Sequence, residues 1–157
     1  MRFVDTNVLL YAASTAPEEQ TKTRLALSLL DRNDLALSVQ VLQEFYVQAT
    51  RSGKRDRLTH EQAALLIESF LRFPVQETTV QLMQAALAVK ERFRISYWDA
   101  AILVAARMLG CQTVLSEDLR HGQVYDGVRV VDPFVREAGN SAYPPCHPSA
   151  RRVRWCL

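Results

Sequence analysis

The chain has 157 residues, a formal net charge of +2 at neutral pH and three cysteines. A single domain of this length buries roughly 70% of the surface that its unfolded form exposes, so folding requires no metal or disulfide. The apolar runs are far shorter than the roughly 20 residues that span a bilayer, and the N-terminus lacks the pattern of a signal peptide. These features exclude a membrane-spanning protein and predict a soluble cytoplasmic one.

The cysteines and histidines indicate neither a disulfide framework nor a zinc site. Cys111, Cys146 and Cys156 are odd in number and unevenly spaced, and the three histidines show no zinc-type pairing with them. A net charge of +2 is too small to indicate a nucleic acid partner by itself. Any electrostatic argument must therefore come from where the charged residues lie.

The first residues predict a short buried strand that ends in polar side chains. Phe3 and Val4 form an apolar run too short for a helix, and Asp5, Thr6 and Asn7 follow it. One interpretation is that the three polar residues only cap a helix that begins near Asn7, because their side chains accept hydrogen bonds from free N–H groups. The other is that Asp5 lies at the carboxyl end of a central strand, where open α/β sheets place their ligand sites.

Short strands then alternate with longer helices along the chain. Periodicity and capping signals predict, after a first helix from about Asn7, helices over residues 17–32, 39–53, 60–72, 78–93 and 96–110. Further strands are predicted over residues 35–38, 74–75, 113–115 and 128–131. Such alternation predicts a three-layer α/β/α fold with a mostly parallel central sheet of about five short strands.

Two segments carry further expectations about packing and domain organisation. In the helix over residues 78–93, the apolar stripe expected to face inward is Val80, Met83, Ala86 and Leu87. Periodicity ends near residue 136, and residues 137–157 hold three of the six prolines together with Arg151, Arg152 and Arg154. The sequence therefore predicts a folded domain over residues 1–136 and an extended or disordered basic tail over residues 137–157.

Four acidic residues occupy positions that a parallel sheet would bring to one edge. Asp5 and Asp118 come just after predicted strands. Glu44 lies near the start of a helix that follows a strand, and Asp99 lies in the first turn of another helix. Three of these positions have an ordinary alternative as well. Asp99 can form a capping box with Ser96, Glu44 can be a solvated helix residue, and Asp118 can be a turn residue, because turns favour Asp.

Convergence of these acids on one cleft would require a cation, because neighbouring carboxylates repel each other. Oxygen ligands without Cys or His favour Mg²⁺ or Mn²⁺ over zinc. Such an ion can activate water and stabilise charge on a phosphoryl oxygen, which makes phosphodiester hydrolysis the natural reaction. Thr6, Asn7 and Ser116 could bond to metal-bound water or orient the carboxylates, although capping and turn formation are open to them as well.

Taken together, the motifs resemble those of PIN-domain ribonucleases, specifically the VapC-type toxins of bacterial toxin–antitoxin pairs. The matching segments are Asp5-Thr6-Asn7 after an apolar strand, Glu44 in a helix after the second strand, Tyr97-Trp98-Asp99-Ala100-Ala101-Ile102, and Leu115-Ser116-Glu117-Asp118-Leu119 with Gly122. Any one motif is weak, but four in order are specific. The resemblance covers roughly residues 1–136, which we therefore expect to form a PIN-like nuclease domain.

The resemblance implies an endoribonuclease that depends on Mg²⁺ or Mn²⁺. Its metal-binding and catalytic acids would be Asp5, Glu44 and Asp99, with Asp118 as the fourth. Glu117 is adjacent to Asp118 and could take that fourth position instead. The resemblance also implies an RNA substrate, a cognate antitoxin bound over the early helices, and a homodimer. The residues after about 137 depart from the family, whose members generally end soon after the last strand.

Other interpretations stay open at this point. The basic residues Arg51, Lys54 and Arg55, with Arg57, could bind RNA phosphates beside the acids, or could form a solvated loop. A phosphatase of the haloacid dehalogenase type also has an Asp after its first strand, but requires a second Asp where this chain has Asn7. A non-catalytic PIN-like RNA-binding or scaffold module typically lacks one or more of the acids, and this chain retains them all.

Overall fold

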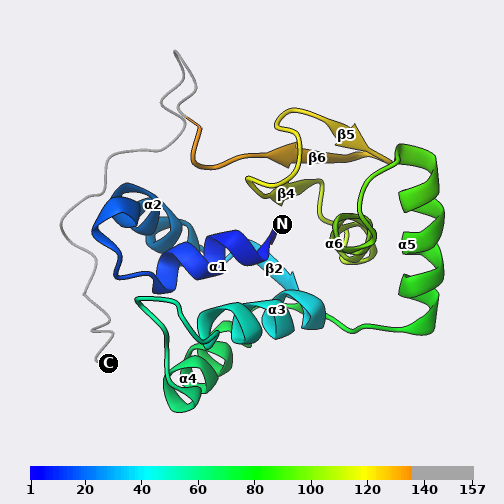
Figure 1. The fold of residues 1–157 in the computed structure, drawn as a ribbon. Coiled ribbons are helices and arrows are strands. Elements are labelled where there is room, and N and C mark those ends of the chain that lie inside the picture. The colour runs from blue at the N-terminus through cyan, green and yellow to red at the C-terminus, as the bar shows by residue number, and fades with distance from the viewer. Residues whose placement is uncertain (136–157) are drawn as a thin grey trace.

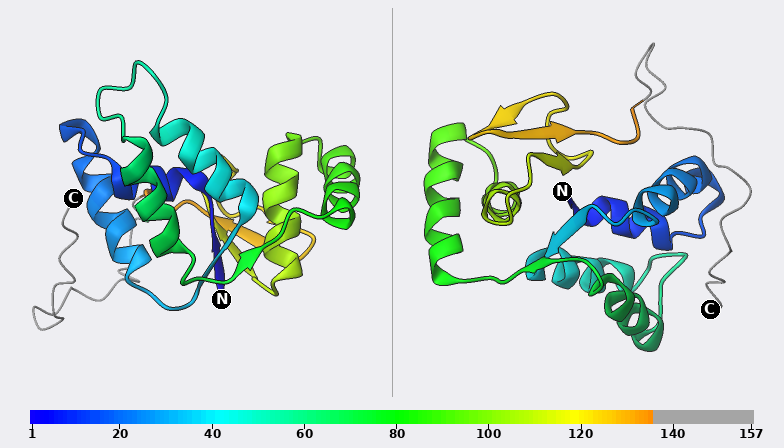
Figure 2. Two further views of the ribbon diagram at one scale, coloured as in Figure 1. Left: turned by 90° about the horizontal axis from the view of Figure 1, so that it is seen from below. Right: turned by 180° about the vertical axis from the view of Figure 1, so that it is seen from behind.

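The computed structural model describes residues 1–135, in which a six-stranded sheet lies between two layers of helices (Figure 1). One layer consists of α1 (Thr6–Ala13), α2 (Gln20–Leu30), α3 (Val39–Ala49) and α4 (His60–Phe70), with a 3₁₀ turn (Pro17–Glu19) before α2. The other layer consists of α5 (Val80–Phe93) and α6 (Tyr97–Met108). Figure 2 shows the same separation from behind. The predicted three-layer α/β/α fold is confirmed.

The strands are β1 (Arg2–Val4), β2 (Leu35–Ser38), β3 (Val75–Gln76), β4 (Thr113–Leu115), β5 (Val124–Tyr125) and β6 (Val128–Val131). Their spatial order is β3-β2-β1-β4-β6-β5, and every neighbouring pair is parallel except β5 and β6. The sequence predicts five of these strands and misses β5. Two residues are too few to show a strand periodicity, and only the Asp126-Gly127 turn, with φ values of 44° and 85°, marks the hairpin.

Strand β1 lies at the point where the order of the strands reverses. The chain passes from β1 to β2 on one side of it, and β4 later pairs with the other side. Because Val4 is paired with Leu115, the next residues of the two strands, Asp5 and Ser116, are neighbours at the carboxyl edge. The backbone N–H of Asp5 donates to the carbonyl oxygen of Leu115 at 3.0 Å. Parallel sheets place ligand sites at this kind of switch point.

The core is formed by strands that are buried on both faces. Phe3, Val4, Leu35, Leu37 and Val114 have no exposed surface. This explains why the strands read as continuous apolar runs rather than as alternating ones. Residues 100–106 of α6 are all buried, because the sheet covers one side of this helix and α5 covers another.

The face of α5 that packs on the molecule differs from the prediction. The buried residues are Leu82, Ala86 and Val89. Of the four predicted inward residues only Ala86 is buried, and the other three are exposed by 68% (Val80), 41% (Met83) and 51% (Leu87). Both sets have helical spacing, so periodicity alone could not choose between them. An apolar stripe of Val80, Met83 and Leu87, here called the α5 stripe, therefore faces solvent.

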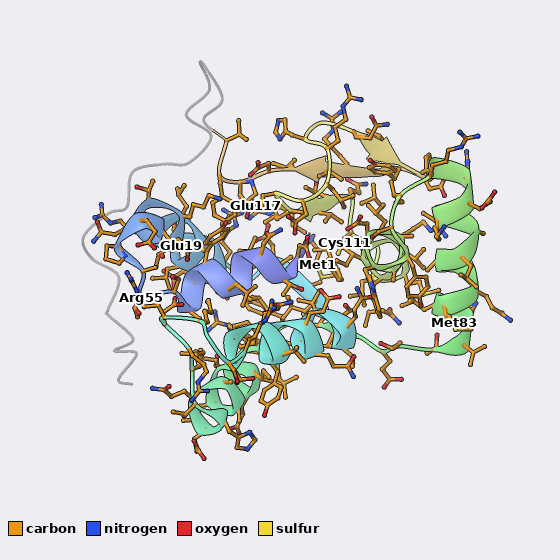
Figure 3. All side chains as sticks on the ribbon, viewed as in Figure 1. Met1, Glu19, Arg55, Met83, Cys111 and Glu117 are labelled. Atoms are coloured by element: carbon orange, nitrogen blue, oxygen red, sulfur yellow. The ribbon has the colours of Figure 1, made fainter. Side chains whose placement is uncertain are left out.

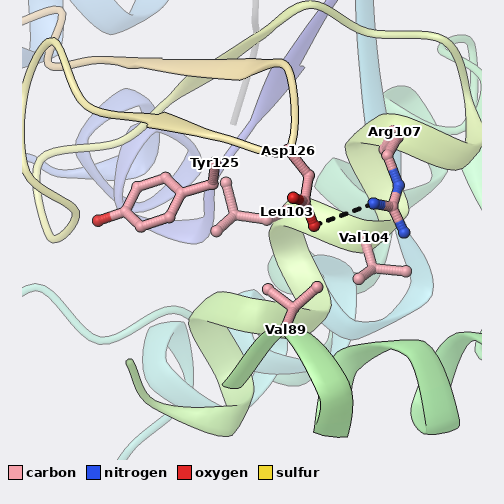
Figure 4. A pocket seen from close by; sticks show the side chains of 6 residues that line it. All are labelled: Val89, Leu103, Val104, Arg107, Tyr125 and Asp126. Carbon is pink, nitrogen blue, oxygen red and sulfur yellow. Dashed lines mark hydrogen bonds and ion pairs between the residues drawn. The ribbon is translucent and has the colours of Figure 1, made fainter. Parts of the chain in front are cut away.

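The turn between β5 and β6 is tied to the second helix layer through Asp126. Its carboxylate accepts a hydrogen bond from Arg92 of α5 at 2.6 Å. It accepts another from Arg107 of α6 at 3.2 Å (Figure 4). A hollow of about 10 Å³ lies beside this contact, lined in part by Tyr125. A hollow of that size holds one water at most, so no substrate site lies there.

The predicted tail over residues 137–157 and the predicted domain boundary at residue 136 lie outside the described residues. No helix in the described part of the chain is long and apolar enough to cross a membrane. Within residues 1–135 Cys111 is the one cysteine, and it is buried as a thiol. The described part of the chain therefore contains no disulfide.

Candidate active site

Asp5 lies at the carboxyl end of β1 and is 4% exposed. Its Oδ1 accepts a hydrogen bond from the backbone N–H of Thr6 at 2.6 Å, so Asp5 is the N-cap of α1. Its Oδ2 accepts from the hydroxyl of Ser116 at 2.5 Å and from the amide of Asn7 at 3.3 Å. Asp5 thus both caps a helix and lies at the carboxyl end of a central strand, because one oxygen caps α1 and the other faces the end of the neighbouring strand β4.

The pKa of Asp5 is raised to about 6, chiefly because burial disfavours the charged carboxylate. Hydrogen bonds from Ser116 and from the backbone of Thr6 lower the pKa, while the negative charges of Asp118 and Glu44 raise it again. A carboxyl group in these surroundings is stabilised as an anion by a cation bound beside it.

Asn7 connects Asp5 to the end of β4. Its Nδ2 lies 3.3 Å from Oδ2 of Asp5, 3.2 Å from Oδ2 of Asp118 and 3.4 Å from Oγ of Ser116. Its Oδ1 is buried and has no hydrogen-bond partner among residues 1–135. An unpaired buried acceptor costs about 1–3 kcal/mol, and an amide oxygen is also a ligand that hard cations accept.

Glu44 on α3 reaches the same edge through Thr6. The hydroxyl of Thr6 donates to Oε2 of Glu44 at 3.0 Å, and Gln40 donates to Oε1 at 3.2 Å. The same Nε2 atom of Gln40 lies 3.3 Å from the carbonyl oxygen of Trp98 at the start of α6. Gln40 was not among the residues predicted from the sequence, although its position four residues before Glu44 on one helix face was a signal for this contact.

Asp99 is held by the cap of α6 rather than by the other acids. The hydroxyl of Ser96 accepts from the backbone N–H of Asp99 at 3.0 Å and donates to its Oδ2 at 2.8 Å. The predicted N-cap is confirmed, although the carboxylate bonds to the hydroxyl of Ser96 and not to its backbone N–H. No hydrogen bond among the described residues joins Asp99 to Asp5, Glu44 or Asp118.

Glu117 and Asp118 have different partners. The hydroxyl of Tyr11 donates to Oε1 of Glu117 at 2.5 Å, and Nζ of Lys22 lies 2.5 Å from its Oε2. Figure 3 labels Glu117 beside α1. Asp118 instead bonds to Asn7, and its backbone N–H donates to the hydroxyl of Ser116 at 3.1 Å. The structure thus joins Asp118, and not Glu117, to the group around Asp5.

These side chains fit a hard divalent cation, although no three His, Cys, Asp or Glu side chains within residues 1–135 form a group that could hold a metal. Mg²⁺ usually takes one or two protein carboxylates and keeps several waters. Asp5 and Asp118 supply such a pair, bridged by the amide of Asn7. A cation there would offset the unfavourable ionisation of Asp5.

The three predicted RNA contacts lie on the loop that follows α3. Arg51 and Lys54 line a pocket of about 440 Å³, and Arg55 is on the same loop but outside the lining. Figure 3 shows Arg55 at the end of α1 far from Met1. All three cations are exposed.

Comparison with known proteins identifies the family. Residues 2–127 match the model of the PIN domain. A comparison with curated proteins gave no match. Among solved structures, the fold is similar to VapC20 of Mycobacterium tuberculosis, described as a Sarcin-Ricin loop cleaving toxin, with 23% identity, a TM-score of 0.59, and coverage of 75% of this chain and 92% of that one.

Two complexes are similar at the level of the fold. A toxin–antitoxin complex from Klebsiella pneumoniae has 19% identity, a TM-score of 0.62, and coverage of 85% and 98% of the two chains. VapBC2 from Rickettsia felis, bound to a DNA fragment from their promoter, has 18% identity, a TM-score of 0.56, and coverage of 82% and 96%. The family match covers most of the chain and agrees with the resemblance predicted from the sequence. The chain belongs to the PIN domain family.

Proposed function

We propose that the chain is a divalent-metal-dependent endoribonuclease and the toxin of a toxin–antitoxin pair. The observation that carries the proposal is the buried Asp5 at the switch point of the sheet, bonded to Ser116 and bridged by Asn7 to Asp118. RNA is the substrate class that we infer, because a structure of similar fold is described as cleaving the Sarcin-Ricin loop.

Asp5 and Asp118 would hold the metal ion, and the hydrogen bonds around them fix their orientation. Bound Mg²⁺ or Mn²⁺ would polarise a phosphoryl oxygen and lower the pKa of water. Ser116 and Asn7 keep Oδ2 of Asp5 directed at the end of β4. Glu44, held by Thr6, adds a carboxylate that is only partly buried and can accept a proton at the solvent side of the group.

The decisive experiment is an RNA cleavage assay on the purified protein with Mg²⁺, Mn²⁺ or EDTA, using tRNA, rRNA and mRNA. Asp5→Asn should abolish cleavage while the circular dichroism spectrum stays unchanged. Glu68→Gln, at an exposed position on α4, is the matched control and should cleave like the wild type. Full activity of Asp5→Asn, or full activity in excess EDTA, would exclude the proposed chemistry.

A cognate antitoxin is the partner that we infer, because structures of similar fold were solved as toxin–antitoxin complexes. We expect it to cover the early helices α1 and α2, as the family resemblance implies. Expression of the wild-type chain alone should slow bacterial growth, and a protein encoded beside it should relieve the effect. If wild type and Asp5→Asn are equally harmless at matched expression, a non-catalytic PIN module becomes the better description.

We also infer a homodimer, with the α5 stripe as the contact between the two copies. In a two-fold contact each surface meets its own copy, so residue i faces residue j and residue j faces residue i. Two antiparallel copies of α5 would bring Val80 opposite Leu87 and Met83 near its own copy. The exposed Glu77 before one end of the stripe would then lie beside the exposed Lys90 at the other end.

A further inference from the structure

We propose that the pocket beside the loop after α3 binds a backbone phosphate of the RNA strand, a few nucleotides from the bond that is cleaved. The inference deepens the proposed nuclease function and rests on it. The pocket measures about 440 Å³ and is lined by Leu10, Gln48, Arg51, Ser52, Gly53 and Lys54. Its volume is in the range of small-ligand sites.

The pocket is lined by two cationic side chains and lies on a basic loop. Residues 51–57 contain four cationic side chains and one carboxylate, Asp56. No hydrogen bond or ion pair engages the side chain of Arg51 among the described residues, while Nζ of Lys54 lies 3.3 Å from Asp56. The guanidinium of Arg51 is therefore available for an anion, and a phosphate is the anion for which its planar donor array is suited.

The loop is anchored, so its cations have a defined position. Oδ2 of Asp56 accepts hydrogen bonds from the hydroxyl of Ser14 at 2.9 Å and from the backbone N–H of Thr15 at 3.4 Å. Partial burial raises the pKa of Asp56, but the bonds from Ser14 and Lys54 outweigh this effect and hold the pKa below its ordinary value. Two residues further on, the N–H of the buried Leu58 donates to the carbonyl oxygen of Ala49, the last residue of α3, at 2.9 Å.

A turn brings the two lining cations to the same hollow. The backbone N–H of Lys54 donates to the carbonyl oxygen of Arg51 at 3.4 Å. Gly53, between them, has a φ of +87°, a conformation that residues with a Cβ rarely adopt. The turn therefore depends on glycine. It places Arg51 and Lys54 in the lining of one pocket, together with Gln48 of α3.

The pocket continues the face of α3 that carries Glu44. Gln48 follows Glu44 by four residues, which places both on one side of α3, and Arg51 comes just after the end of this helix. On α1, Leu10 follows Thr6 by four residues in the same way. Since Thr6 bonds to Glu44 and Leu10 shares the pocket with Gln48, the two helices run side by side from the acids to the pocket. Glu44 and Gln48 are about 6 Å apart along α3, and Arg51 and Lys54 lie beyond the end of the helix, so a strand of a few nucleotides covers the whole distance.

An RNA strand is the occupant that this arrangement favours. A strand whose cleaved phosphate lies at Asp5 and Glu44 reaches the pocket by following the α1–α3 face. Its next phosphates meet Gln48 and Arg51, which both carry N–H donors, and then the ammonium of Lys54. An acidic segment of a protein partner is the competing occupant, and binding measurements separate the two.

The test measures RNA binding without cleavage. Asp5→Asn protein in EDTA is titrated with single-stranded RNA by fluorescence anisotropy at several salt concentrations. The pocket variant adds Arg51→Ala and Lys54→Ala to this protein, and the control variant adds Arg55→Ala and Arg57→Ala instead. Both variants remove two positive charges from one loop, but only the first changes the pocket lining.

We expect the pocket variant to bind RNA on the order of tenfold more weakly than the control variant. The slope of log K against log salt should fall by about 0.7 for each phosphate that the pocket no longer neutralises. The difference should vanish with a dinucleotide, which is too short to reach from the acids to the pocket. Circular dichroism confirms that all variants are folded.

Three results would overturn the pocket proposal. They are an equal loss of RNA binding in both double variants, no RNA binding by the Asp5→Asn protein, and a loss confined to the binding of an acidic protein partner. Cleavage by the wild type is assayed separately. A wild type that binds RNA through the pocket but does not cut it would contradict the nuclease function and leave the binding site in place.

Discussion

Nζ of Lys22 lies 2.5 Å from Oε2 of Glu117. This ion pair distinguishes Glu117 from its neighbour in the sequence, Asp118, which bonds to Asn7 instead. The same ammonium lies 4.3 Å from the centre of the Tyr11 ring and 5.3 Å from that of Phe134. Against the effect of burial, the bonds to Glu117 and Tyr11 raise the pKa of Lys22. The charge of Glu117 is thus paired with partners on α1 and α2, and we propose Asp118 as the fourth acid that the sequence left open.

Asp118→Asn should therefore weaken Mn²⁺ binding far more than Glu117→Gln does. We expect a loss of about 10–100-fold for Asp118→Asn, because it removes a ligand or its immediate support. Glu117→Gln leaves the Asn7 bridge in place and should change the affinity by only a small factor. Isothermal titration calorimetry with Mn²⁺ measures both constants. The reverse order would show that Glu117 is the fourth acid.

Asp5→Asn should stabilise the metal-free protein at neutral pH and lose that advantage in acid. The pKa of Asp5 is about 6 in the fold against an ordinary value of 3.8, so its ionisation is costlier in the native state than in the unfolded state. This cost is absent below the unfolded pKa, grows as the pH rises, and is complete above about pH 6, where it reaches roughly 3 kcal/mol at most.

Urea unfolding of wild type and Asp5→Asn in EDTA, at a pH near 3.8 and at a pH well above 6, tests this. The amide can still accept the hydrogen bond from Thr6 that caps α1. A stability difference that does not depend on pH would mean that the ionisation of Asp5 is not what the variant relieves.

Strand ends were predictable from the sequence, and so was the edge at which Asp5 and Asp118 lie. Each apolar run stops abruptly at a polar residue, and a parallel sheet collects such ends on one side. What the sequence could not show is how the side chains divide their hydrogen bonds. Asp99 bonds to the N-cap residue Ser96, and an acid at this position in the first turn of a helix could equally have been a residue of the active site. The partners of Glu117 lie on α1 and α2, far away in the sequence.

The α5 stripe illustrates a second limit. Leu82, Ala86 and Val89 form one apolar face, and Val80, Met83 and Leu87 form another. A helix with two such faces can bury either, and the choice depends on the groove that α6 offers. The face left outside is the one that we assign to a second copy of the chain.

Met83→Glu combined with Leu87→Glu should convert a dimer into a monomer. The charge added at position 83 would lie near its own copy at the two-fold axis, where like charges repel, and the charge added at position 87 would lie against the apolar Val80 of the other copy. Both side chains are exposed within one chain, so the fold should change little in stability. Sedimentation equilibrium measures the mass, and Leu65→Glu, at a residue on α4 that is 65% exposed, is the control. A monomeric wild type, or a dimer in the double variant, would contradict this contact.

Asp99→Asn should melt close to the wild-type temperature in EDTA, yet gain less than wild type when Mn²⁺ is added. Without metal, Asp99 is not among the charges that raise the pKa of Asp5, and an amide oxygen can still accept from the hydroxyl of Ser96. Gln40 bonds to both the carbonyl oxygen of Trp98 and Glu44 and so connects the start of α6 to the acidic edge, which is why we expect the charge of Asp99 to act on a cation bound there.

A ligand that binds only the native state stabilises it by about 2.7 kcal/mol at one hundred times its dissociation constant, and by less when the affinity falls. Removal of a negative charge from the edge lowers the affinity for a divalent cation, so the metal-induced rise in melting temperature should shrink. Thermal melts of wild type, Asp99→Asn and Asp118→Asn, each with and without Mn²⁺, give the comparison. Asp118→Asn should lose most of the rise, and Asp99→Asn should lie between it and the wild type. An equal rise in wild type and Asp99→Asn would show that Asp99 takes no part in binding the metal.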